Sequence, residues 1–160
     1  MIVGGALVVP AGYLATLRPP APGPTAIDTT ISERIAVDAV MAIERELGRE
    51  PEEQDHFNPG FDILSKDPIS GELFFIEVKG RAAGAPTVTV TRTEILTGLN
   101  KGEGFILALV PVEDGRAAGV RYLADPFQGE PEAYFDTTSV NYDWKKLSAK
   151  AATVRMEGQA

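Results

Sequence analysis

The amino-acid sequence predicts an α/β domain in which helices flank a mixed β-sheet. Apolar residues follow helical spacing over 30–47 and then switch to the alternation of strands, and a second helix signal separates the later strands. The 160 residues suit one domain of this kind. The 44% hydrophobic and 24% charged residues are close to the average for a soluble globular chain.

The N-terminal part of the chain is expected to lie outside the α/β domain. Residues 1–17 form an apolar segment, which belongs to a preceding domain or packs as an added strand. Residues 18–28 form a proline-rich linker, because prolines are excluded from helix interiors and central strands. The α/β domain then covers 29–160. The apolar start has no basic residue before it and no run reaches a membrane span, so we expect a cytoplasmic protein without a membrane partner.

The first helix is predicted over Thr30–Leu47. Thr30 and Glu33 form a capping box, and apolar residues follow at helical spacing. Arg34 is expected on the solvent face, whereas Glu33 and Glu44 lie at the edge of the apolar stripe.

Strands are predicted after an acidic loop at 50–55. They cover Phe61–Ser65, Glu72–Lys79, Thr87–Thr91, Gly104–Val112 and Val120–Ala124. The first four are expected in one sheet, and the first two form a hairpin.

Two further helices are predicted from the remaining patterns. Thr91 and Glu94 form a second capping box, which opens a short helix to about Asn100. A last helix is expected to begin at Asp143 or Trp144.

Composition excludes several kinds of site. The chain has no cysteine and one histidine, His56, so a thiolate zinc site, a cysteine nucleophile and a multi-histidine metal site are excluded. The net charge of −8 argues against a free-standing nucleic-acid binder held mainly by phosphate contacts. It does not argue against a metal-dependent enzyme, whose carboxylates need a cation.

The informative constellation is Asp62 followed across the hairpin by Glu77 and Lys79. Side chains two apart in a strand point to one face, so Glu77 and Lys79 project together and strand pairing can bring Asp62 beside Glu77. Two carboxylates suit Mg²⁺ or Mn²⁺. A neighbouring lysine can orient water and stabilise charge on a phosphate.

These residues resemble the D…E-x-K core of the PD-(D/E)XK, or restriction-endonuclease-like, nuclease superfamily. The resemblance implies a restriction-endonuclease-like fold with Asp62, Glu77 and Lys79 catalytic and Asp62 and Glu77 as metal ligands. Glu33 near the first helix start would be the upstream acid, as in archaeal Holliday-junction resolvases. The usual proline before the aspartate is absent, because Pro59 lies three positions earlier.

A longer stretch resembles the C-terminal domain of the plant protein NO VEIN. The resemblance covers roughly residues 1–128 and rests on the following segments: Gly4–Gly12, which resembles the segment that precedes the domain in helicases, and Glu44–Pro51, Gly60–Ser65, Phe75–Arg81 and Thr89–Leu96. In bacteria and archaea this domain often ends large Swi/Snf-like helicases, which implies preceding helicase domains as partners and DNA as substrate.

Two functions follow as alternatives. The first is metal-dependent hydrolysis of DNA phosphodiester bonds by a C-terminal nuclease-like module of a helicase-type protein. The second is a catalytically silent module that binds nucleic acid or protein and retains the nuclease fold. Glu44 and Glu94 are lesser site candidates, Arg81 and Arg92 are possible phosphate ligands, and His56 is expected to be structural or incidental.

Overall fold

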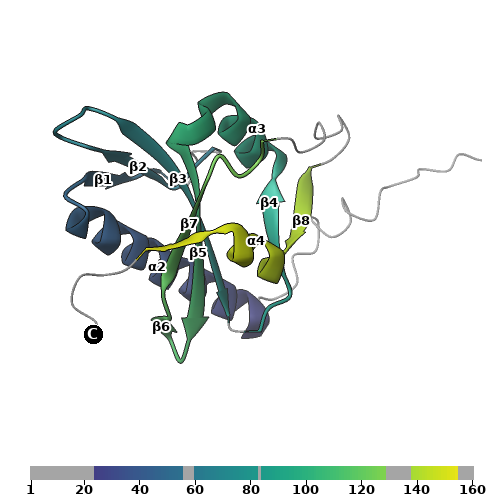
Figure 1. Cartoon of the computed structure of the whole chain (residues 1–160). Helices are drawn as coiled ribbons and strands as arrows, with labels where there is room; N and C mark the ends of the chain where they lie inside the picture. The colour runs from purple at the N-terminus through teal and green to yellow at the C-terminus, as the bar shows by residue number, and fades with distance from the viewer. Residues whose placement is uncertain (1–23, 56–59, 83, 129–137, 155–160) are drawn as a thin grey trace, which may run out of the picture.

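The computed structural model describes residues 24–55, 60–82, 84–128 and 138–154, with side chains from residue 30 onward (Figure 1). Residues 1–17, most of the expected linker at 18–28, and His56 lie outside the described residues. No helix in the described part is both long and apolar enough to cross a membrane.

The described chain alternates helices and strands. In order, the elements are α2 (Pro24–Glu46), β1 (Glu50–Glu53), β2 (Ile63–Lys66), β3 (Leu73–Ala82), β4 (Thr87–Thr91), α3 (Arg92–Lys101), a 3₁₀ turn (Gly102–Gly104), β5 (Phe105–Glu113), β6 (Arg116–Ala117), β7 (Val120–Ala124), β8 (Ser139–Asp143), α4 (Trp144–Lys150) and β9 (Ala152–Val154).

The main sheet is mixed, as the sequence predicted. Within the described ranges its strand order is β1-β2-β3-β5-β7-β9, with β6 paired to β5. The central pair β3 and β5 is parallel, and the other pairs are antiparallel. The α3 crossover between β3 and β5 makes their parallel pairing possible.

The two faces of the sheet are covered by different elements (Figure 1). Along β5, Ile106 and Ala108 face α2, whereas Leu107 and Leu109 face the second layer formed by β4, β8, α3 and α4. Both faces are apolar because β5 is a central strand covered on both sides. The same alternation in β3 directs Ile76 and Val78 toward α2 and leaves Glu77 on the opposite face.

The first helix differs from its prediction. It begins at Pro24 rather than Thr30, so residues 24–28 of the expected linker are helical and the Thr30–Glu33 pair lies inside the helix rather than capping it. The buried stripe contains Ala36, Val40 and Ile43, whereas Ile31 and Leu47 are half-exposed. A T-x-x-E sequence inside a helix looks the same as a capping box, because only the upstream backbone distinguishes them.

Strand pairing also corrects two predictions. The expected acidic loop at 50–55 contains β1, which pairs with β2 at the edge of the sheet. The strand Thr87–Thr91 is present as predicted, but it forms a separate two-stranded sheet with β8 rather than joining the main sheet. Alternation of apolar and polar residues predicts a half-buried strand, but it does not indicate which other strand that strand pairs with.

The two later helix starts are confirmed. Thr91 accepts a hydrogen bond from the Glu94 N–H, and Glu94 accepts one from the Thr91 N–H, which completes the capping box of α3. Asp143 caps α4 by accepting a hydrogen bond from the Lys146 N–H.

Helix α2 crosses β3 directly over Gly80. A Cβ atom added at Gly80 would lie 2.5 Å from the Ser32 carbonyl oxygen and 2.8 Å from the Ala36 Cβ. Both neighbours belong to a packed helix, so the helix itself would have to move. A glycine at this position therefore sets the distance between α2 and β3.

We predict that Gly80→Ala lowers the free energy of unfolding by about 1–3 kcal/mol, because it forces α2 away from β3. Gly104→Ala is the control. Its added Cβ would meet the Leu73 carbonyl oxygen at 3.3 Å, a contact that a shift of a few tenths of an ångström relieves, so the smaller loss of stability is expected there. Urea titration of both variants measures the difference. Equal stability of the wild type and Gly80→Ala would contradict this packing.

Candidate active site

The candidate site forms where β2 separates from β3. The ladder between these strands ends at Ile63 and Ile76, and the Asp62 N–H then donates to the Ile76 carbonyl at 2.9 Å. One residue further, the Asp62 carboxylate replaces a backbone acceptor: the Val78 N–H donates to its Oδ2 at 2.8 Å. On the other side, the Asp62 carbonyl accepts the Gln54 N–H at 2.8 Å. Asp62 is thus fixed between β1 and β3.

Lys79 connects two acidic side chains beside this point. Its Nζ lies 2.6 Å from Glu77 Oε1 and 2.7 Å from Glu94 Oε2. Glu77 and Glu94 are buried, and the Lys79 side chain is 15% exposed. Glu94 is held in turn by the α3 capping box. The lysine ammonium is therefore positioned by the strand that carries it and by the start of α3.

The site concentrates negative charge away from solvent. Burial raises the pKa of Glu77 well above its usual value, Asp62 and Glu94 raise it further, and Lys79 opposes the rise. Burial also raises the pKa of Asp62, against the opposing effects of the Val78 N–H and Lys79. Burial disfavours the charged form of Lys79, but Glu77 and Glu94 outweigh it and raise the pKa of this side chain. Three carboxylates therefore share one ammonium group.

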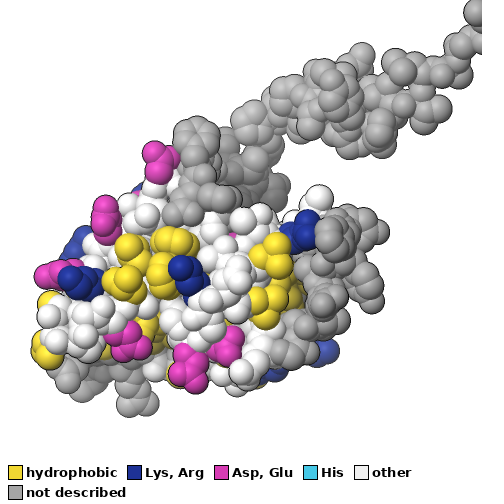
Figure 2. All heavy atoms as spheres, turned by 90° about the horizontal axis from the view of Figure 1, so that it is seen from above, with side chains coloured by type: hydrophobic (Ala, Val, Ile, Leu, Met, Phe, Trp, Pro, Cys, Tyr) yellow, Lys and Arg dark blue, Asp and Glu magenta, His cyan; other side chains and the backbone are white. Residues whose placement is uncertain are grey.

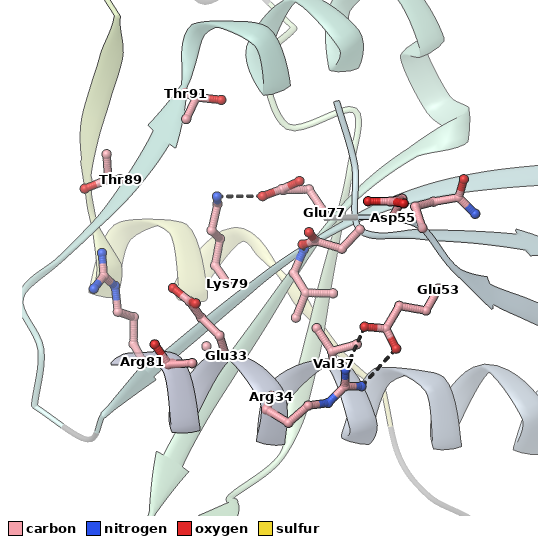
Figure 3. A pocket seen from close by; sticks show the side chains of 15 residues that line it. Glu33, Arg34, Val37, Glu53, Asp55, Glu77, Lys79, Arg81, Thr89 and Thr91 are labelled. Carbon is pink, nitrogen blue, oxygen red and sulfur yellow. Dashed lines mark hydrogen bonds and ion pairs between the residues drawn. The ribbon is translucent and has the colours of Figure 1, made fainter. Parts of the chain in front are cut away.

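A cavity of about 550 Å³ opens over this cluster. Asp62, Glu77 and Lys79 line it, together with Glu33 from α2. Figure 3 shows Lys79 near the centre, paired with Glu77. The remaining lining residues are Thr30, Arg34, Val37, Glu53, Gln54, Asp55, Val78, Gly80, Arg81, Thr89 and Thr91.

The part of the chain that forms the candidate site is also the part that matches a known family. The family model described as "Protein NO VEIN, C-terminal" matches residues 32–123, more than half of the chain. The chain belongs to this family. The matched region includes Glu33, Asp62, Glu77, Lys79 and Glu94. No curated protein matches the chain.

One similar solved structure is Hjc, a Holliday junction resolvase from Archaeoglobus fulgidus, an archaeal hyperthermophile. The two chains are 14% identical, the match covers 77% of this chain and 91% of that chain, and the TM-score is 0.51. This similarity and the mixed sheet confirm the predicted restriction-endonuclease-like fold for this NO VEIN C-terminal domain.

The four site residues predicted from the sequence of this NO VEIN domain line one cavity. Among the lesser candidates, Arg81 also lines it and Glu94 pairs with Lys79, whereas Glu44 lies elsewhere. Glu44 is fully buried elsewhere, where it accepts the Tyr122 hydroxyl at 2.8 Å and pairs with Arg49 at 3.2 Å. Arg34, expected to face solvent, is half-exposed and pairs with Asp38 and Glu53. It thereby ties α2 to β1 at the rim of the cavity.

Sequence reasoning missed part of the cavity wall. Glu94, which was predicted as a cap and a lesser site candidate, does not line the cavity but pairs with Lys79. Glu53 and Asp55 belonged to an expected loop, yet they form the wall beside β1. The density of acids over 50–55 was the available signal, because carboxylates concentrated before Asp62 can share its site.

The donor set of the NO VEIN domain fits a hard divalent cation that takes few protein ligands. Among the described residues, no group of three or more His, Cys, Asp or Glu side chains forms a metal cluster. Two carboxylates and a backbone carbonyl nevertheless suit Mg²⁺, which retains several waters. The Val78 N–H binds Oδ2 of Asp62, and Lys79 binds Oε1 of Glu77. The Val78 carbonyl points toward the same edge of β3 as the Val78 N–H, and therefore toward Asp62.

Replacing Lys79 tests the shared charge of the cluster. We predict that Lys79→Met lowers the free energy of unfolding by about 3 kcal/mol in EDTA, because buried Glu77 and Glu94 lose their common cation. Lys66→Met at an exposed position of β2 is the control and should change stability by less than about 0.5 kcal/mol. Urea unfolding gives both values, and equal effects would contradict the importance of this ion-pair cluster.

Proposed function

We propose that this chain hydrolyses DNA phosphodiester bonds with Mg²⁺ or Mn²⁺. The observation that carries the proposal is the joint placement of Asp62, Glu77 and Lys79 at one cavity beside the open edge of β3. The restriction-endonuclease-like fold supports a nuclease-like protein. Asp62 and Glu77 supply carboxylates for a divalent metal ion, and Lys79 supplies a positive charge for the phosphate. Metal-assisted hydrolysis of a phosphodiester requires both.

Asp62 and Glu77, with the Val78 carbonyl, are the residues that would hold the cation. The excess of carboxylate over ammonium in a poorly solvated cluster supports this assignment, because a divalent ion offsets such charge. When bound, the ion supplies Lewis-acid chemistry: it acidifies a water and reduces charge on the phosphate.

The other side chains of the site would orient the attacking water and bind the phosphate. Lys79 orients the attacking water and stabilises charge that develops on the phosphate oxygens. Glu33 faces the cavity from α2 and is positioned to hold a water or the cation, and Arg81 offers a phosphate ligand.

In the proposed reaction, the oxygen of the attacking water bonds to phosphorus as the water proton passes to solvent. The bond to the leaving oxygen breaks, and that oxygen takes a proton from solvent.

The charge of the chain bears on how DNA reaches the site. On the face shown in Figure 2, acidic and basic side chains are interspersed rather than gathered into a basic surface. Together with the net charge of −8, this predicts weak DNA binding by the domain alone. We therefore propose that it works as the C-terminal module of a helicase-type protein whose other domains deliver DNA. The same charge is the observation that favours the alternative, a catalytically silent interaction module.

DNA cleavage tests the proposal directly. Wild-type protein with Mn²⁺ or Mg²⁺ should cleave labelled DNA, and EDTA should stop the reaction. Asp62→Asn and Glu77→Gln should each lower the rate by about 100-fold or more through loss of the ion. Lys79→Ala should lower the rate by about 100-fold while keeping metal affinity, because it removes the stabilising charge at the phosphate and leaves both carboxylate ligands in place.

The matched control for the cleavage experiment is Glu52→Gln, which removes an exposed carboxylate of β1 that does not line the cavity. Its rate should remain within about twofold of wild type. Cleavage unaffected by Asp62→Asn and Lys79→Ala, or absent with every divalent metal in the full-length protein, would favour the silent module.

A further inference from the structure

The outer face of the small β4–β8 sheet is polar and exposed. Alternation buries Val88 and Val90 of β4 against the main sheet. The opposite face of the two strands presents only hydroxyl, amide and one carboxyl side chain: Thr87, Thr89, Thr91, Ser139, Asn141 and Asp143.

This face is continuous with the candidate active site. Thr89 and Thr91 line the cavity that contains Asp62 and Lys79. Figure 3 shows these threonines on β4 to one side of Lys79, with Glu53 and Asp55 on the other side. The outer face of β4–β8 therefore forms one wall of the cavity and extends away from it.

The two sides of the cavity differ in charge. Four carboxylates lie in or shortly after β1. Arg34 pairs with Glu53, and the other three, Glu50, Glu52 and Asp55, would repel a polyanion. On the β4–β8 side, the outer face carries a single carboxylate, that of Asp143, which caps α4. Exposed lysines follow β8 within α4, at Lys145, Lys146 and Lys150. A polyanion is thus favoured on the β4–β8 side.

The side chains of this face suit a sugar–phosphate backbone. Thr89 donates its hydroxyl to Asn141 Oδ1 at 2.7 Å, so the amide nitrogen of Asn141 retains two hydrogens to donate outward. Hydroxyl and amide groups are common phosphate ligands in DNA complexes, and they fix the position of the strand without reading its sequence.

We propose that the outer face of the β4–β8 sheet binds the sugar–phosphate backbone of a DNA strand and leads it into the cavity at Lys79. The inference rests on the proposed function and extends it by naming the surface that the substrate occupies. It also explains how a chain with net negative charge can accept DNA: the strand crosses the side of the cavity that lacks the β1 carboxylates.

A matched pair of substitutions tests this surface. Asn141→Asp adds one negative charge to the outer face and preserves the oxygen that accepts the Thr89 hydroxyl. Asn100→Asp adds the same charge at an exposed position of α3. Binding of labelled single-stranded and duplex DNA is measured with Ca²⁺ in place of Mg²⁺ at low salt, so that cleavage does not enter the readout.

We expect Asn141→Asp to weaken DNA binding about fivefold or more and Asn100→Asp to change it by less than about twofold. Asn141→Lys provides a second variant, which should strengthen binding and increase its salt dependence by about one ion. Equal effects at positions 141 and 100, tighter binding of RNA of the same sequence, or no binding by wild type would overturn the proposed surface.

The outcome for this surface is separable from the outcome for catalysis. If wild-type protein cleaves DNA but the substitutions at 141 and 100 have equal effects, the surface is wrong and the proposed function stands. If binding responds as expected but no divalent metal supports cleavage, the surface stands and the chain binds DNA without cutting it.

Discussion

The structure depends on the hydrogen bond from the Val78 N–H to the Asp62 carboxylate. Because a side chain takes the place of the next backbone acceptor, β2 leaves β3 at this point and the edge of β3 opens. The Asp62 carboxylate is thereby held next to β3, where Glu77 and Lys79 line the same cavity. The cavity, its acidic walls and the proposed chemistry all follow from this local separation of two strands.

Lys79, which pairs with Glu77 and Glu94, belongs to a buried charge cluster that is energetically unfavourable in itself. Burying several carboxylates around one ammonium is unfavourable unless their geometry and partners are well fixed. The capping box of α3 and the pairing of β3 with β5 supply that fixation. A site of this kind is poorly explained as packing, because apolar residues of similar volume would fill the space at lower cost.

Local patterns predicted the centre of the site, and long-range pairing determined the rest. Asp62, Glu77 and Lys79 could be grouped because a short hairpin and the two-residue period of a strand relate them. Glu94 could be predicted as a cap and as a lesser site candidate but not as the partner of Lys79, since that pairing requires the start of α3 to fold against β3. The charged, proline-containing β1 was missed because its strand form depends on pairing with β2.

The most direct test is the anomalous scattering of manganese in a crystal of the chain soaked with Mn²⁺. We predict one strong peak between the carboxylates of Asp62 and Glu77, within ligand distance of the Val78 carbonyl, and loss of that peak in a crystal of Glu77→Gln. No peak at this place under saturating Mn²⁺, or a peak that Glu77→Gln leaves unchanged, would contradict a metal-dependent site at the point where β2 and β3 separate.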